Sequence, residues 1–174
     1  MIIACADSRV APSTIFSAAP GELFVVRNVA ALVPPADDDG SYHDTSAAIE
    51  FAVTGLKVTN VVVMGHEMCG GVNACLAAAE SKPVGQFIGK WVEILAPARE
   101  QVIETIPSND MSERQLLLER LGVQRSITNL LTYRFVAKAV TEGHLRLHGA
   151  WFSIAEGTLY WLDQATGAFE QVQS

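Results

Sequence analysis

Short apolar runs alternate with helical patterns along the first half of the chain. The apolar runs predict strands at residues 2–4, 23–27 and 58–64. The last of these is continuous and rich in β-branched residues, as expected for a strand that is covered on both faces. Between the runs, a short helix follows Pro12, a second is capped by Asp44 or Thr45, and a third begins at Gly70-Gly71. This alternation predicts a parallel sheet with right-handed crossover connections.

The second half of the chain is mostly helical and ends in alternating strands. Helices are expected over residues 86–106, 112–131 and 134–142, with Ser112 and Gln115 as a capping box. Two further strands, at 144–153 and 158–162, are expected to pair antiparallel. We therefore expect an α/β fold with a mostly parallel central β-sheet flanked by helices and an antiparallel edge strand near the C-terminus. No linker divides the sequence, so residues 1–174 are expected to form a single domain.

Composition and charge narrow the class of protein. Hydrophobic residues make up 49% of the chain and charged residues 18%, which argues against disorder. A net charge of −7 argues against binding to nucleic acid or to an anionic membrane surface. The apolar runs are too short to span a membrane, and the N-terminus lacks the basic leader of a signal peptide. The three cysteines indicate free thiols or metal ligands in a reducing compartment, so we predict a cytoplasmic location.

Three residues of types that commonly bind metals follow predicted strands. Cys5 ends the first strand, His66 follows the 58–64 strand, and Cys69 stands where the next helix begins. If these two strands are neighbours in a parallel sheet, both sulfurs and the imidazole converge on one point, as in a zinc site that keeps a fourth position for water. Taken singly, each cysteine also fits a small buried hydrophobe and His66 a hydrogen-bonded core residue. Cys75, among alanines in the helix, is expected to pack in the core.

A carboxylate and a guanidinium stand directly after the first of these cysteines. Asp7, two residues beyond Cys5, is close enough in sequence to reach a metal or its bound water. Arg9 can hold that carboxylate ionised through charge-assisted hydrogen bonds. An ordinary salt bridge in a surface loop is the alternative interpretation.

Three blocks of sequence together carry a family resemblance. Residues 5–10 (CADSRV), 20–30 (PGELFVVRNVA) and 65–71 (GHEMCGG) strongly resemble the β-class carbonic anhydrases, in the same order and at the family's separation. The resemblance implies an enzyme with one Zn²⁺ per chain that interconverts carbon dioxide and water with bicarbonate and a proton. Cys5, His66 and Cys69 match the family's metal ligands. Asp7 and Arg9 match its catalytic dyad, which orients a zinc-bound hydroxide for attack on carbon dioxide.

The resemblance also implies a substrate pocket and an assembly. Gly70 matches the glycine whose backbone N–H helps to bind bicarbonate, and Phe24, Val29 and Phe51 match positions that line a small apolar pocket. Family members form homodimers or larger homo-oligomers with active sites at subunit interfaces. They usually carry an N-terminal helical arm that is missing from this sequence.

Particular substitutions refine the expected subtype and leave alternatives open. Ile2 and Phe152 replace a tryptophan and a tyrosine of the bicarbonate-inhibited subtype, so the chain resembles the open-site, plant-like subtype. Phe51 replaces a tyrosine common in plant relatives. A hydrolase of carbon disulfide or carbonyl sulfide on the same site, or a truncated, non-catalytic zinc-stabilised relative, are the alternatives. His43 is a candidate proton relay, although a solvated loop histidine is the simpler interpretation, and His144 and His148 are expected to be strand residues.

Overall fold

A six-stranded sheet forms the centre of the molecule. The computed structural model describes residues 1–37, 44–79, 84–108 and 110–173. The strands lie in the order β2-β1-β3-β4-β5-β6. Their bounds are β1 (Ile2–Cys5), β2 (Val25–Asn28), β3 (Asn60–His66), β4 (Arg146–Ser153), β5 (Thr158–Leu162) and β6 (Phe169–Gln171).

The pairing of the strands confirms the expected fold class. β1 is parallel to both β2 and β3, and β3 is parallel to β4. β5 is antiparallel to β4, and β6 is antiparallel to β5. β6 was not predicted, because three residues, two of them exposed, carry too little alternation to indicate a strand.

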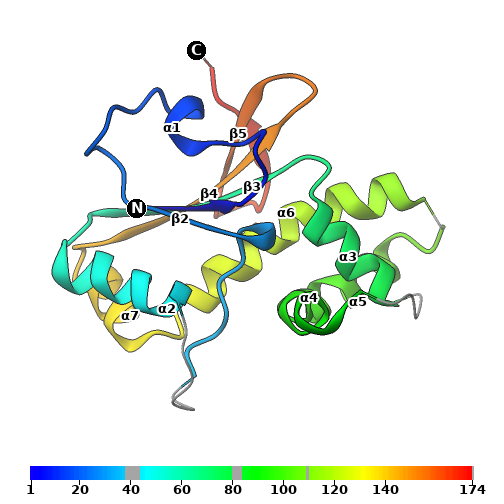
Figure 1. Ribbon diagram of the computed structural model, residues 1–174, viewed down its shortest axis with the longest axis horizontal. Coiled ribbons are helices and arrows are strands. Elements are labelled where there is room, and N and C mark those ends of the chain that lie inside the picture. Colours follow the sequence, from blue (N-terminus) through cyan, green and yellow to red (C-terminus); the bar gives the residue numbers. More distant parts are fainter. Residues whose placement is uncertain (38–43, 80–83, 109, 174) are drawn as a thin grey trace.

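Helices cover the sheet and extend beyond it (Figure 1). The longer elements are α2 (Asp44–Glu50), α3 (Gly70–Ala79), α4 (Gln86–Val92), α5 (Ala96–Thr105), α6 (Met111–Leu130) and α7 (Arg134–Thr141). The shorter ones are α1 (Pro12–Ile15), the 3₁₀ turns η1 (Val29–Ala31) and η3 (Glu93–Leu95), and the π-helical turn η2 (Phe51–Gly55), which continues α2.

Two expectations about these helices are corrected by the structure. The helix expected at 86–106 is divided into α4, η3 and α5, and Pro97 occupies the first turn of α5, where its missing N–H costs nothing. The expected capping box at Ser112 does not start α6. Asp110 caps this helix instead, since its carboxylate accepts the N–H groups of Ser112 and Glu113 at 3.0 and 3.1 Å.

The core lies on both faces of the parallel strands. In β1, Ile2 and Ala4 belong to one buried cluster, whereas Ile3 belongs to the cluster on the other face. This alternation follows from the two-residue period of a strand. None of the described helices is long and apolar enough to cross a membrane.

Helix α6 packs against β3 and β4 at two glycines. A Cβ atom at Gly65 would lie 2.8 Å from Val123 Cγ2, and one at Gly149 would lie 2.9 Å from Val123 Cγ1. Real Cβ atoms do not approach this closely, so the glycines allow α6 to lie directly on the sheet. The carboxyl ends of β1 and β3, beside this contact, are where the candidate site is built.

Candidate metal centre

The three predicted metal ligands converge at the carboxyl ends of two neighbouring strands. Cys5 is the last residue of β1, His66 is the last residue of β3, and Cys69 directly precedes α3. Their ligand atoms all lie within 4.8 Å of one another, and the two sulfurs are 3.9 Å apart. The pairing of β1 with β3 therefore brings together residues that are distant in sequence.

The histidine ring is oriented so that one nitrogen is free to bind a metal. His66 is 1% exposed. Its Nδ1 lies 2.8 Å from the Glu67 carbonyl oxygen, which only accepts hydrogen bonds, so Nδ1 carries the proton. Nε2 then carries a lone pair, and it is buried without a hydrogen-bond partner among the described residues. A buried nitrogen without a partner beside two sulfurs fits a zinc ion, whose usual ligands are imidazole and thiolate.

The contact between the two thiols shifts their pKa values in opposite directions. The hydrogen bond from Cys69 lowers the pKa of Cys5, against the effect of burial. The same hydrogen bond raises the pKa of Cys69. A divalent cation between the sulfurs would remove this conflict, because it stabilises both thiolates.

Asp7 and Arg9 form a bidentate pair beside the three ligands. Arg9 Nε donates to Asp7 Oδ1 at 3.0 Å and Arg9 Nη2 donates to Oδ2 at 2.6 Å, while the Arg9 backbone N–H also reaches Oδ1 at 2.9 Å. These hydrogen bonds hold the pKa of Asp7 well below its usual range, so the carboxylate stays ionised.

Arg27 is a further contact of this loop that the sequence did not reveal. Its Nε donates to the Cys5 carbonyl oxygen at 2.9 Å, and its Nη2 donates to the Asp7 carbonyl oxygen. The guanidinium on β2 thus binds the backbone on both sides of the turn that leaves β1. An arginine within an apolar strand was the only signal in the sequence.

Two of the predicted pocket residues lie close together: Gly70 begins α3, and Val29 belongs to η1, which packs against the start of α3. A Cβ at Gly70 would meet nothing within 4 Å, so its backbone is open to a ligand. Val29 packs against the next residue, because a Cβ at Gly71 would lie 2.6 Å from Val29 Cγ1. Val29 also lines a cavity of about 380 Å³, together with Asn28, Asp44, Phe87, Ile88 and Trp91.

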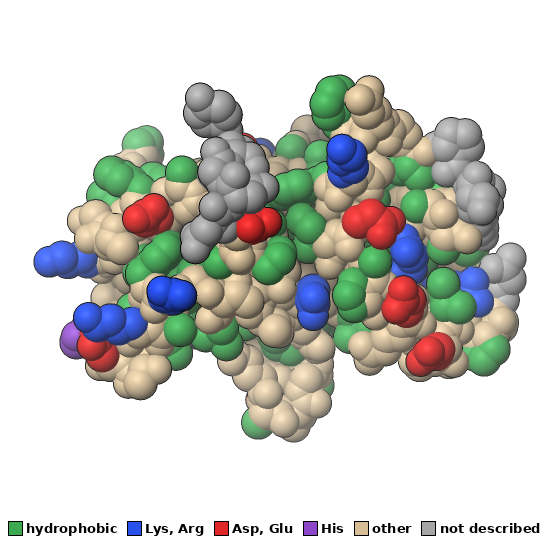
Figure 2. Space-filling model, turned by 90° about the horizontal axis from the view of Figure 1, so that it is seen from below, with side chains coloured by type: hydrophobic (Ala, Val, Ile, Leu, Met, Phe, Trp, Pro, Cys, Tyr) green, Lys and Arg blue, Asp and Glu red, His purple; other side chains and the backbone are tan. Residues whose placement is uncertain are grey.

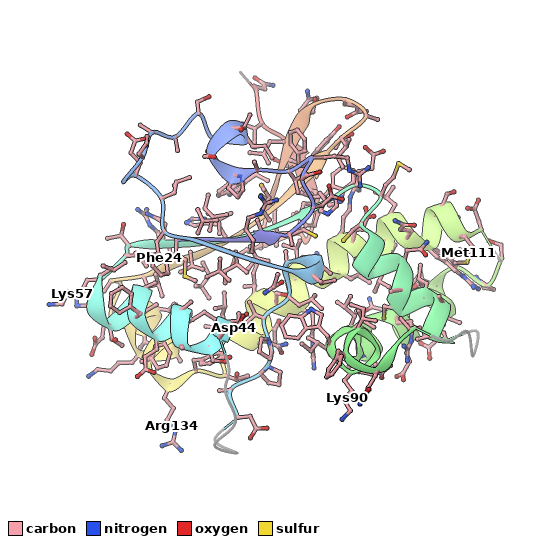
Figure 3. All side chains as sticks on the ribbon, viewed as in Figure 1. Phe24, Asp44, Lys57, Lys90, Met111 and Arg134 are labelled. Carbon is pink, nitrogen blue, oxygen red and sulfur yellow. The ribbon has the colours of Figure 1, made fainter. Side chains whose placement is uncertain are left out.

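The other two pocket residues lie at the opposite end of the sheet. Phe24 immediately precedes β2, level with Ile2 at the start of β1, whereas Cys5 is level with Asn28. The rings of Phe24 and Phe51 contact each other, with centroids 5.9 Å apart. Figure 3 shows Phe24 toward the Lys57 end of the molecule. Within one chain, these two residues are not brought to the metal ligands.

The remaining histidines and the third cysteine lie away from the site. His148 is on β4 as expected, where its Nε2 is 2.9 Å from Asn60 Oδ1. His144 was expected in the same strand, but this prediction is wrong: its N–H bonds to the Ala139 carbonyl oxygen after α7, and β4 begins two residues later. Cys75 is fully buried in α3, as expected for packing. His43 lies outside the described residues.

One buried acid beside the centre was not predicted. Glu119 of α6 is 3% exposed and accepts the backbone N–H of Cys69 at 2.9 Å. Burial raises the pKa of its carboxyl group, against the effect of its hydrogen bonds. An acid four residues before the buried Val123, on the same face of the helix, was the only signal.

Comparison with known proteins agrees with this geometry. The family model described as "Carbonic anhydrase" matches residues 1–159. Beta carbonic anhydrase 3 of Arabidopsis thaliana is 36% identical over 174 residues, covering 97% of this chain and 67% of that protein. Beta carbonic anhydrase 5, chloroplastic, of the same plant is 36% identical over 159 residues, covering 91% of this chain and only 52% of that protein.

Solved structures of the same class share the fold. The β-carbonic anhydrase CcaA superposes with a TM-score of 0.91 at 26% identity, covering 99% of this chain and 77% of that one. One of two tetrameric β-carbonic anhydrases from Sordaria macrospora gives a TM-score of 0.82 at 33% identity, covering 92% and 78%. The family model and these relatives show that the chain belongs to the β-carbonic anhydrase family, and the convergence of Cys5, His66 and Cys69 agrees with this.

Proposed function

We propose that this chain is a zinc-dependent carbonic anhydrase, which interconverts carbon dioxide and water with bicarbonate and a proton. The observation that carries the proposal is the placement of an ionised, bidentately held carboxylate directly beside a Cys-His-Cys cluster. A metal site that only stabilises the fold has no use for such a carboxylate. Membership of the family supports the same reaction.

The cluster has the donors that zinc requires. Cys5 Sγ, Cys69 Sγ and His66 Nε2 would hold the ion. When bound, zinc supplies a nucleophile at neutral pH, because it lowers the pKa of a bound water from about 15.7 to about 7.

The residues around the cluster orient the nucleophile and the substrate. Arg9 occupies both oxygens of Asp7 from one side and fixes the plane of the carboxylate. A remaining lone pair of Asp7 then accepts the hydrogen bond of the attacking group and directs it toward the carbon of carbon dioxide. The backbone N–H of Gly70 would bind an oxygen of bicarbonate, and the open space beside Gly70 supports this role.

The apolar part of the substrate pocket is completed by a second subunit. Val29 lies near the cluster, whereas Phe24 and Phe51 lie at the far end of β2. In a homo-oligomer, the exposed edge of β2 can face the same edge of the partner. Each chain then contributes Phe24 and Phe51 to the pocket of the other chain. The tetrameric relative supports such an assembly. A cytoplasmic location remains a prediction, since one relative is named chloroplastic.

Replacing the carboxylate tests the proposed reaction. Asp7→Ala should lower the rate of carbon dioxide hydration by about a hundredfold or more, the usual loss when a proton-handling group is removed. Zinc content should stay near one ion per chain, because Asp7 is not among the three converging ligands. Stopped-flow hydration with a pH indicator and metal analysis on the same samples measure both quantities.

Asp37→Ala is the matched control. Asp37 is an exposed acid outside the helices and strands, so this change should leave the rate unchanged. Loss of zinc from Asp7→Ala would instead make Asp7 a metal ligand. A wild-type protein that binds zinc but does not hydrate carbon dioxide would refute the proposed reaction.

A further inference from the structure

Glu119 is a buried carboxylate with three hydrogen-bond donors around it and no part in the proposed reaction. Its Oε1 accepts the Cys69 N–H at 2.9 Å and Gln115 Nε2 at 3.1 Å. Its Oε2 accepts the indole N–H of Trp151 at 3.2 Å. The carboxylate therefore joins the metal-binding loop to α6 and to β4.

The contact with Cys69 fixes one particular peptide group. The N–H of the Met68–Cys69 peptide donates to Glu119, and its carbonyl oxygen accepts a hydrogen bond from Arg9 Nη2 at 3.3 Å. This peptide is thus held between the buried carboxylate of α6 and the guanidinium that orients Asp7. Because hydrogen bonds polarise one another along such a chain, the two ends are coupled.

The backbone at this point needs support. Met68 has a φ of 54°, a left-handed conformation that is unfavourable for a residue with a side chain, and it is exposed. Its own side chain therefore contributes little packing to hold the turn between His66 and Cys69. At the Met68–Cys69 peptide, the hydrogen bond from the Cys69 N–H to Glu119 and the hydrogen bond from Arg9 to the Met68 carbonyl oxygen oppose relaxation of this turn.

A second residue of α6, Gln115, also contacts Cys69. Gln115 Nε2, one turn before Glu119, lies 3.5 Å from the Cys69 carbonyl oxygen as well as 3.1 Å from Glu119 Oε1. Both backbone groups of Cys69 are thereby tied to α6. The helix can reach them because Gly65 allows it to lie directly on β3.

We propose that Glu119 is a positioning residue of the metal centre: by accepting the Cys69 N–H, it holds the Met68–Cys69 peptide so that the Cys69 sulfur and Arg9 both keep their places. The proposal rests on the metal site of the proposed function and not on its reaction. Partners of this kind, one step removed from the metal, typically contribute about ten- to hundredfold to metal affinity.

The decisive variant is Glu119→Gln. An amide has only one acceptor oxygen, so its NH₂ group must face a donor, either the Trp151 indole or the Cys69 N–H. We expect zinc to bind about ten- to hundredfold more weakly, as measured by competition with a chromophoric chelator. We also expect the thiolate-to-metal charge-transfer band of the cobalt(II)-substituted protein to shift. Glu113→Gln, in an exposed acid of the same helix, is the control and should change neither.

A double variant separates positioning from general stability. In Glu119→Gln with Trp151→Phe, the donor opposite Oε2 is gone, so the amide NH₂ meets no donor there and the amide oxygen can again accept the Cys69 N–H. Zinc affinity and the cobalt spectrum should then return toward those of Trp151→Phe alone. If Glu119→Gln does not fold, Glu119→Asp, which keeps the charge but withdraws the carboxylate from the Cys69 N–H by one methylene, should weaken zinc binding and shift the cobalt band in the same way.

Two results would overturn the proposal. One is a Glu119→Gln protein with a lowered melting temperature but unchanged zinc affinity and cobalt spectrum, which would show that the carboxylate only anchors α6. The other is a double variant that binds zinc no better than Glu119→Gln. Neither result depends on carbon dioxide hydration, so failure of the proposed reaction would be recognised separately.

Discussion

At the scale of single residues, His66 shows how a side chain is prepared for a metal. The Glu67 carbonyl oxygen fixes the proton on Nδ1, and this sets both the tautomer and the direction of the ring. The Glu67 side chain is held in turn, since its Oε2 accepts Ser153 Oγ at 3.0 Å and the Ala155 N–H at 2.8 Å. The start of the loop after β3 is therefore held by residues at the end of β4, and the free nitrogen of His66 lies near the two sulfurs.

His148 predicts a pH dependence of stability that is independent of the metal centre. Burial, with a smaller contribution from the Arg146 charge, lowers the pKa of His148 below its usual value. The folded state thus binds this proton less readily than the unfolded chain, whose histidine pKa is about 6.5. The resulting stability is present above that pH and is lost as the pH falls through the folded pKa.

We expect His148→Gln to reduce this loss of stability. Urea unfolding at about pH 7.5 and about pH 5.5 should give a smaller difference in the free energy of unfolding for the variant than for the wild type. His144→Gln, in an exposed histidine, is the control. Equal differences in all three proteins would contradict the assignment.

The convergence of Cys5, His66 and Cys69 was predictable from the sequence, but the contacts that support these residues were not. Cys5 and His66 could be placed together because each ends a predicted strand, and parallel strands end at the same edge of a sheet. Glu119 could not be connected to Cys69, because a hydrogen bond to a backbone N–H leaves no pattern of side-chain types. Phe24 and Phe51 could be assigned to a pocket by resemblance, but their distance from the ligands within one chain appears only in three dimensions.

At the scale of elements, α6 links the sheet to the metal-binding loop. Val123 packs against the glycines of both β3 and β4, and Glu119 and Gln115 extend the same face of the helix to Cys69. The distance of α6 from β3 therefore decides whether its side chains reach the loop.

Gly65→Ala tests this contact. The added Cβ would lie 2.8 Å from Val123 Cγ2 and 3.4 Å from the Glu119 carbonyl oxygen, so α6 must move away from β3. We expect the free energy of unfolding to fall by about 1–3 kcal/mol, the usual cost of overpacking. Adding Val123→Ala to Gly65→Ala should recover part of this loss, because it removes the methyl groups that the new Cβ would meet. Urea unfolding of the two single variants and the double variant measures the recovery. Equal stability of Gly65→Ala and wild type would show that the helix adjusts without cost.

The type of most elements followed from the hydrophobic pattern, but several boundaries did not. β1 and β3 contain short apolar runs with Ile or Val, which favour strands that are covered on both faces. The break between α4 and α5 and the π-helical turn η2 depend on packing, which the period of the sequence does not record. Asp110 replaced Ser112 as the cap because both residue types cap helices well, and only the backbone decides between neighbours.

At the scale of the whole molecule, the two edges of the sheet differ. The outer side of β2 pairs with no described strand, and Val25, Phe51 and Leu56 are exposed nearby, with Phe51 54% exposed. The far edge is β6, followed by the exposed Val172. On the face drawn in Figure 2, acidic, basic and apolar side chains are interspersed.

Phe51→Asp tests the proposed use of the β2 edge. A charge in the centre of an apolar contact should shift the protein from oligomer to monomer, as measured by light scattering after gel filtration. Zinc should still bind, because all three ligands belong to one chain. Val172→Asp, at the other edge, should leave the contact along β2 intact. A Phe51→Asp protein of wild-type mass would place the interface elsewhere.

The fold class was accessible from the sequence because strands and helices alternate at a length that only a parallel sheet with crossovers accommodates. The assembly was not, since an exposed phenylalanine is equally compatible with a monomer surface and with a contact between subunits.

Glu119 follows Cys69 by 50 residues, so the ribosome synthesises Cys69 well before the residue that accepts its N–H. Cys5, His66 and Cys69 are all translated well before α6, whose Glu119 contacts Cys69. A nascent chain can therefore capture an ion early, on a loop still free to rearrange, and the geometry becomes fixed only when α6 emerges and docks. Synthesis that stalls between α3 and α6 would leave the three donors on a loop that can still rearrange.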